Sequence, residues 1–131
     1  MDVSHIIDGL NDAQRAAVTA PIGSALVLAG AGSGKTRVLI ERAIRLLTRE
    51  EDPLRLSEIL AITFTEKAAL EMKVRLADEL EKHRGPAARS QVQWAWVSTI
   101  HGFCSRLLRE NAVEAGVDPS FAVLDEERAR A

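Results

Sequence analysis

A glycine-rich loop constrains the fold of this chain more than any other feature of its sequence. Residues Ala29 to Thr36 read AGAGSGKT. Glycines let the backbone wrap closely around an anion while amide N–H groups and a helix N-terminus point at it. The loop follows the apolar run Ser24–Ala29, typical of a buried strand, and precedes helical periodicity from Lys35 to Thr48. A strand, a glycine loop and a helix in this order predict a phosphate-binding loop.

The residues of the loop have separate tasks in holding a nucleoside triphosphate. The lysine charge suits the outer phosphates, and the next hydroxyl completes the shell of a magnesium ion. Lys35 and Thr36 are therefore the catalytic candidates, Thr36 is the metal ligand, and ATP and Mg²⁺ are the expected cofactors. The general pattern starts with glycine where this chain has Ala29, and the alternative is a flexible turn that happens to hold a lysine. The phosphate-binding residues predicted here are Ala29, Gly30, Ala31, Gly32, Ser33, Gly34, Lys35, Thr36 and Arg37.

Helices and strands are predicted to alternate through the first two thirds of the chain. Asn11 is placed to cap a helix from Asp12 to about Ala20, with Gln14 completing a capping box. After a surface connection over Arg49–Ser57, residues Ile59–Phe64 read as a second buried strand. A helix over 68–82 then has one apolar face, formed by Ala69, Met72, Leu76 and Leu80.

The last third repeats this order. Arg84–Ser90 reads as a loop, Val92–Val97 as a third strand, and Ile100–Ala115 as a helix that Gly116 stops. Strands and helices that alternate at these lengths imply parallel pairing. The fold class predicted is α/β, with a parallel sheet flanked by helices.

Composition narrows the partners. The chain has 131 residues with 17 basic and 19 acidic side chains, a net charge of −2, so any contact with DNA must be local. The apolar run Ala25–Ala29 is far shorter than the roughly 20 residues that span a bilayer, and no membrane partner is expected. Cys104 is the single cysteine, which excludes an internal disulfide, favours the cytoplasm, and predicts a small buried apolar side chain.

Four further segments, in order along the chain, carry a family resemblance. They are LNDAQRAA at Leu10–Ala17, AITFTEKAALEMKVRL at Ala61–Leu76, VSTIHGFCSRLLR at Val97–Arg109 and FAVLDEE at Phe121–Glu127. Together with the glycine loop they resemble the start of the UvrD/Rep-like branch of superfamily 1 DNA helicases, over essentially the whole chain. Glu66, where many members have asparagine, is most similar to the recombination-repair helicase-nucleases typified by AddA and RecB.

The resemblance gives Gln14 a second task. In this family the glutamine ahead of the phosphate loop reads adenine, and a carboxamide offers the donor and acceptor that suit the N6 and N7 edge. The resemblance thus adds Gln14 to the nucleotide-binding residues. The alternative is that Gln14 only closes the capping box.

The resemblance also implies a path for single-stranded DNA. An aromatic side chain can stack on an unpaired base, and hydroxyls, a lysine or a neutral imidazole can hold phosphate or sugar. The DNA-binding residues implied are Thr63, Phe64, Thr65, Lys67, Thr99 and His101. The alternatives are that Phe64 fills the core, that Lys67 is merely solvated, and that His101 bonds to local backbone.

The family fold is a RecA-like P-loop NTPase, and residues 1–131 would form the N-terminal part of its motor domain. The acidic motif that completes the magnesium site and the second motor domain are not identifiable, and Asp125–Glu127 are expected to open a helix. The resemblance implies a 3′-to-5′ translocase of repair or recombination, with the rest of the motor and a possible nuclease as partners. We expect this chain to hold ATP without appreciable turnover. The rival is a noncatalytic nucleotide- or DNA-binding module; a small-molecule kinase would lack TFTEKAA and STIHGF.

Overall fold

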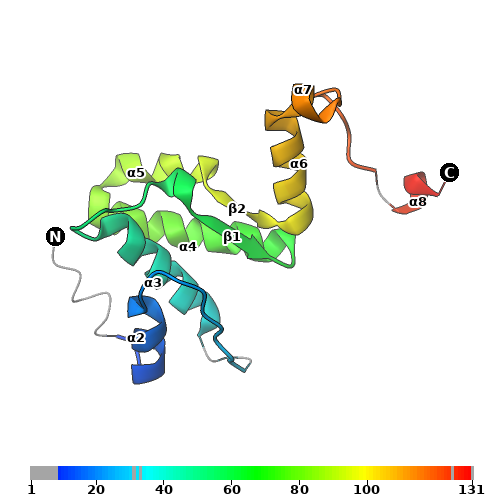
Figure 1. The fold of residues 1–131 in the computed structure, drawn as a ribbon. Coiled ribbons are helices and arrows are strands. Elements are labelled where there is room, and N and C mark those ends of the chain that lie inside the picture. Colours follow the sequence, from blue (N-terminus) through cyan, green and yellow to red (C-terminus); the bar gives the residue numbers. More distant parts are fainter. Residues whose placement is uncertain (1–8, 31, 33, 125, 131) are drawn as a thin grey trace.

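The computed structural model describes residues 9–30, 32, 34–124 and 126–130. Helices dominate the described part, and Figure 1 shows the order of the elements along the chain. The elements are α2 (Asp12–Thr19), α3 (Lys35–Thr48), η1 (Leu56–Glu58), β1 (Leu60–Thr63), α4 (Glu66–Arg84), α5 (Pro86–Gln91), η2 (Val92–Trp94), β2 (Trp96–Thr99), α6 (Ile100–Glu110), α7 (Ala112–Ala115) and α8 (Glu126–Ala129).

Two short strands form a parallel sheet. β1 pairs with β2 so that Leu60 lies opposite Trp96 and Thr63 lies opposite Thr99. α4 begins directly after β1, and α6 begins directly after β2. Because the strands are parallel and in register, both helices start at the same edge of the sheet. The prediction of an α/β fold with parallel strands and flanking helices is confirmed, in the form of a two-stranded sheet.

The core lies where α4 meets its neighbours. α4 contacts α3, α5, β1 and β2, and it runs through the middle of this group in Figure 1. The four apolar positions that helical spacing predicted for α4 are all buried, namely Ala69, Met72, Leu76 and Leu80. α3 contributes Ile40, Ile44 and Leu47, of which Ile44 and Leu47 are 0% exposed. Each such buried side chain contributes about 1.5–3 kcal/mol to folding.

The strand predicted over Ser24–Ala29 is wrong. In the part of the chain that the structure describes, the sheet contains β1 and β2, and this segment pairs with neither. Leu26 is 84% exposed and Leu28 is 87% exposed. An apolar run becomes a buried strand only where other strands satisfy its backbone and other side chains cover it, and neither condition holds here.

The loop predicted over Arg84–Ser90 is also wrong, because α5 occupies most of it. Gly85, with φ 83°, ends α4, and Pro86 takes the first position of the new helix. A proline costs no hydrogen bond at that position, since the first amides of a helix have no partner within it. The signal for a turn was therefore the signal for one helix ending and another beginning.

The third strand starts later than predicted. β2 begins at Trp96, whereas the prediction began it at Val92. The preceding residues form the 3₁₀ turn η2, in which Val92 is 2% exposed. The apolar character of Val92 reflects burial in the core and not membership of the strand.

The predicted helix over Ile100–Ala115 is interrupted at Asn111, which has φ −125° and ψ 35° and separates α6 from α7. Gly116, with φ 69°, ends α7 as predicted. Cys104 is exposed, so its predicted burial is wrong; α6 stands away from the helical core in Figure 1. None of the helices in the described residues is long and apolar enough to cross a membrane.

Candidate nucleotide and nucleic-acid site

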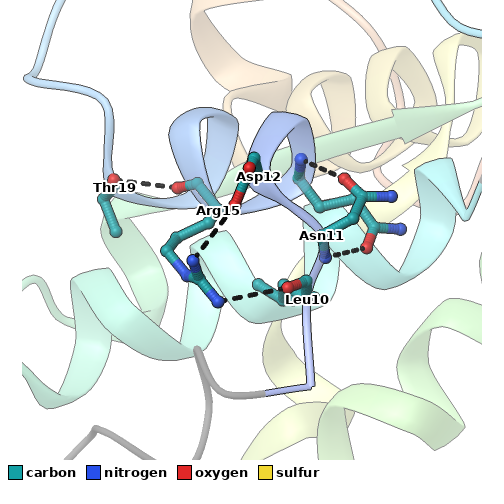
Figure 2. Close-up of polar contacts among 6 residues, drawn as sticks. Leu10, Asn11, Asp12, Arg15 and Thr19 are labelled. Carbon is teal, nitrogen blue, oxygen red and sulfur yellow. Dashed lines mark hydrogen bonds and ion pairs between the residues drawn. The ribbon is translucent and has the colours of Figure 1, made fainter.

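Helix α2 begins with a reciprocal cap that fixes Gln14. The Asn11 side-chain oxygen accepts a hydrogen bond from the Gln14 backbone N–H at 2.9 Å, and the Asn11 N–H donates to Gln14 Oε1 at 3.0 Å. Arg15 donates to the Leu10 carbonyl and to the Asp12 carboxylate around the same turn (Figure 2). The capping role predicted for Gln14 is confirmed, and its adenine-reading role stays a prediction.

The Gln14 carboxamide lies directly beside the end of the glycine loop. A Cβ placed on Gly34 would be 2.6 Å from Gln14 Nε2, closer than real Cβ atoms come to other atoms. Gly34 also has φ 83°, a left-handed conformation that glycine adopts without strain. A residue with a side chain at position 34 would therefore push α2 away from α3. The close approach also puts a carboxamide and the first turn of α3 within reach of one small ligand.

The start of α3 differs from the starts of α2, α4 and α6. Those three helices have side-chain caps, whereas no described side chain caps α3, which follows Gly34. The first amides of a helix lack intrahelical acceptors and carry the positive end of its dipole, so they favour an anion. Lys35 and Arg37 are exposed at this end, and Thr36 is half-buried.

A cavity of about 500 Å³ lies between α2, the segment that precedes the glycine loop, and the first two turns of α3. Gln14 of α2 and Lys35 of α3 both contribute to its wall. Ala29 and Gly30 form another part of the wall, and apolar atoms come from Val27, Leu28, Val38 and Leu39. Apolar walls with a few polar groups, in a volume of roughly 300–1,000 Å³, are typical of small-molecule sites.

The structure brings together some of the predicted phosphate-loop residues and does not describe the others. Ala31 and Ser33 lie outside the described residues. Gly32 has φ 74° and Gly34 has φ 83°, the conformational freedom that the glycine pattern predicted. Thr36 and Arg37 follow Lys35 in the first turn of α3. Phosphate binding by these residues stays a prediction.

The predicted DNA-binding residues gather at one edge of the sheet. Thr63 and Thr99 end the two strands opposite each other, and Phe64, Thr65, Lys67 and His101 follow within a few residues. The Phe64 ring is 99% exposed, so the alternative in which it fills the core is wrong. Lys67 and His101 are exposed near the starts of α4 and α6. Their contact with DNA stays a prediction.

The two threonines at the helix starts act as caps. Thr65 Oγ1 accepts from the Ala68 N–H at 3.1 Å and begins α4, and Thr99 Oγ1 accepts from the Gly102 N–H at 3.0 Å and begins α6. Thr63 Oγ1 donates to the Thr65 carbonyl at 3.1 Å. These bonds fix the backbone on both sides of Phe64, so the exposed ring stands on an ordered turn.

A side-chain bond joins the two helix starts. Thr99 Oγ1 lies 3.0 Å from Glu66 Oε1, across 33 residues of sequence. The carboxylate accepts, so the hydroxyl must donate its hydrogen to Glu66 while it accepts from Gly102. Thr99 is 6% exposed and has no side-chain donor left for a phosphate in this conformation. The geometry gives Glu66 and Thr99 the role of holding α4 and α6 together.

An aromatic cluster attaches α6 to β2. The Trp96 and Phe103 rings pack edge to face with centroids 5.5 Å apart. The Arg106 guanidinium lies 3.7 Å from the centroid of the Trp96 ring and donates to the Ala95 carbonyl at 3.3 Å. Cation–π and aromatic pairs of this kind are each worth about 0.5–1.5 kcal/mol. The cluster fixes the direction in which α6 leaves the sheet.

Two features of the site were missed from the sequence. The bond of Glu66 to Thr99 joins residues far apart in the chain, and the motifs gave no signal that they meet. Arg42 of α3 donates to backbone carbonyls at the end of α2. Its position seven residues after Lys35, two helical turns along the same face, was a signal that could have found it.

The described fold is an α/β layer in which helix starts and a glycine loop present the candidate residues. Residues 10–131 match the family described as UvrD/REP helicase N-terminal domain. The chain belongs to this family. The resemblance inferred from the five sequence segments is therefore confirmed, including its extent over nearly the whole chain.

Relatives of two kinds are similar to the chain. "DNA helicase II" of Haemophilus influenzae is 46% identical over 127 residues, which cover 97% of this chain and 17% of that protein. "DNA helicase II" of Escherichia coli is 45% identical over 128 residues, covering 97% of this chain and 16% of that protein. A protein of Acetivibrio thermocellus, named as an ATP-dependent helicase/nuclease subunit, is 41% identical over 128 residues, covering 91% and 10%. The chain thus spans a sixth or less of the length of these relatives.

Proposed function

We propose that this chain is the ATP-binding segment of an ATP-dependent DNA helicase that moves 3′ to 5′ along single-stranded DNA in repair or recombination. The observation that carries the proposal is the cavity whose wall contains both Gln14 and Lys35. A base-reading carboxamide and a phosphate-binding cation on one cavity are what a nucleotide requires. The relatives named as DNA helicases, together with the one named as an ATP-dependent helicase/nuclease component, give the cavity its context.

The residues present fit a nucleoside triphosphate. Gln14 has Oε1 engaged by Asn11, but a carbonyl oxygen has a second lone pair and the amide can also donate, which matches the adenine edge. The uncapped start of α3 and the exposed Lys35 suit the phosphates. Mg²⁺ usually binds few protein oxygens together with phosphate oxygens, and the Thr36 hydroxyl would supply one of them. Bound Mg²⁺ would offset phosphate charge during hydrolysis.

The second part of the proposal concerns the edge that carries Phe64. An exposed aromatic ring beside Lys67 and the start of α4 suits a single strand, whose bases stack and whose phosphates need cations or amides. In the whole protein, nucleotide binding near α3 would change the position of this edge relative to the remainder of the motor. α4 contacts both α3 and the sheet, so it is the element through which the two sites would communicate.

The proposal is tested by Lys35→Ala. Lys35 is exposed, so its truncation leaves the core intact, while loss of its charge should abolish measurable binding of Mg²⁺-ATP. Isothermal titration calorimetry measures the affinity, and circular dichroism checks the fold. Unchanged affinity in the variant would refute the assignment of the loop.

A matched control is Lys82→Ala in α4. Lys82 is also an exposed lysine on a helix, with 68% of its side chain accessible, and it pairs with Glu79 away from the cavity. We expect this variant to bind ATP like the unmodified chain. Equal losses in both variants would show that ATP senses only the general surface charge, which would also contradict the proposal.

A further inference from the structure

Arg42 connects α3 to the end of α2. Its Nη1 donates to the Val18 carbonyl at 3.0 Å and also to the Ala20 carbonyl, and its Nη2 donates to the Pro21 carbonyl at 3.4 Å. These oxygens lie where α2 ends, and the last carbonyls of a helix have no partner within it. The guanidinium therefore satisfies them and places a positive charge at the negative end of the α2 dipole.

The position of Arg42 along α3 relates it to the nucleotide cavity. Lys35 and Arg42 are seven residues apart, so they share one face of the helix at a separation of about 10 Å along its axis. Val38 and Leu39 lie between them and line the cavity. α2 packs against α3, with Gln14 beside Gly34 near one end and its C-terminus on Arg42.

The chain leaves this clamp toward the cavity in two directions. Backward along α2 it reaches Gln14, and forward through residues 22–30 it reaches the wall formed by Val27–Gly30. The same guanidinium thus fixes the origin of both walls. Residues 20–30 contain no helix or strand that could fix them otherwise. Without the clamp, the Asn11 cap would still hold Gln14 on α2, but α2 would be free to shift over α3.

We propose that Arg42 is a positioning residue for base recognition: it holds Gln14 at a set distance from Lys35, so that base and phosphates are bound together. This inference rests on the proposed function, because it assumes that the cavity takes a nucleotide. Arg42 lies beyond the apolar part of the cavity from Lys35, so its effect should fall on the base and not on the phosphates. A residue that only stabilised the fold would affect both parts of the ligand alike.

The test compares Arg42→Gln with the unmodified chain by titration calorimetry, using Mg²⁺-ATP, Mg²⁺-GTP and inorganic tripolyphosphate. We expect ATP to bind about tenfold more weakly, the effect of one mispositioned hydrogen-bonding group. Tripolyphosphate should bind unchanged, so the preference for ATP over GTP should be lost. Arg42→Lys keeps the charge but not the fork and should restore part of the preference. Arg45→Gln, the same change one turn along α3, is the control and should change neither affinity.

The outcomes separate the inference from the proposed function. Parallel losses of ATP and tripolyphosphate in Arg42→Gln, or no loss of either, would overturn the positioning role. If Arg42→Gln does not fold, Arg42→Lys decides by the same ratio of affinities, since it retains a cation at the end of α2. An unmodified chain that binds neither ATP nor tripolyphosphate would overturn the proposed function, and the inference with it.

Discussion

Truncation of Phe64 should separate binding of single-stranded DNA from stability. The ring is 99% exposed, so Phe64→Ala removes almost no buried surface and should change the free energy of unfolding by less than about 0.5 kcal/mol. Stacking of one base on an aromatic side chain is worth about 1–3 kcal/mol by alanine substitution. At 1.4 kcal/mol for each factor of ten, this predicts DNA binding that is about 5- to 150-fold weaker.

The assay is fluorescence anisotropy of a labelled oligothymidylate at one fixed salt concentration, because affinity for DNA depends steeply on salt. Urea denaturation of the same samples gives the free energy of unfolding. Phe64→Tyr keeps a flat ring and should retain most of the affinity. Phe64→Leu keeps an apolar side chain without the ring and should bind nearly as weakly as the alanine variant.

Trp94→Ala is the matched control. Trp94 is also a large exposed aromatic residue, at 70%, but it precedes β2 and so lies at the other end of the sheet from Phe64. We expect its loss to leave DNA affinity unchanged. Equal losses in the two variants, or full affinity in Phe64→Ala, would refute the reasoning that this edge of the sheet binds the strand.

The remaining predictions concern stability, measured by urea denaturation. Thr99→Val removes the cap of α6 and the hydrogen bond to Glu66, and should cost about 1–2 kcal/mol; Thr19→Val, which removes only an exposed bond to a carbonyl in α2, should cost less than about 0.5 kcal/mol. Similar costs in the two would argue against the cap. Leu47→Ala opens a cavity at a side chain that is 0% exposed and should cost about 2–5 kcal/mol, whereas Leu108→Ala, at 41% exposure, should cost clearly less. An inexpensive Leu47→Ala would mean that the core relaxes to fill the space.

Local patterns predicted the parts of the fold that depend on local contacts. The apolar spacing of α4 identified its buried face, because a helix presents residues three and four apart on one side. The Asn11 capping box was predictable for the same reason, since all its atoms lie within one turn. Pro86 was misread because a proline marks both loops and first helical positions, and only the neighbouring structure distinguishes them.

The errors arose where distant parts of the chain decide the outcome. The run Ser24–Ala29 has strand composition, but pairing depends on other strands, and in the described structure none lies beside it. Cys104 has an apolar character, but the direction of α6 leaves it exposed. The motifs predicted which residues follow the two strands, yet not that the Thr99 hydroxyl would be committed to Glu66. A motif specifies residue types, and only packing specifies which of them face each other.

The bond between Glu66 and Thr99 has a mechanical consequence. It ties the first turns of α4 and α6 into one joint, beside the turn that supports Phe64. α4 runs back through the core, while α6 projects outward from the sheet, held in its direction by Trp96 and Arg106 (Figure 1). A displacement of α4 along its axis would therefore swing α6 like a lever about the joint. Rigidity at this point, more than charge, is what the carboxylate contributes.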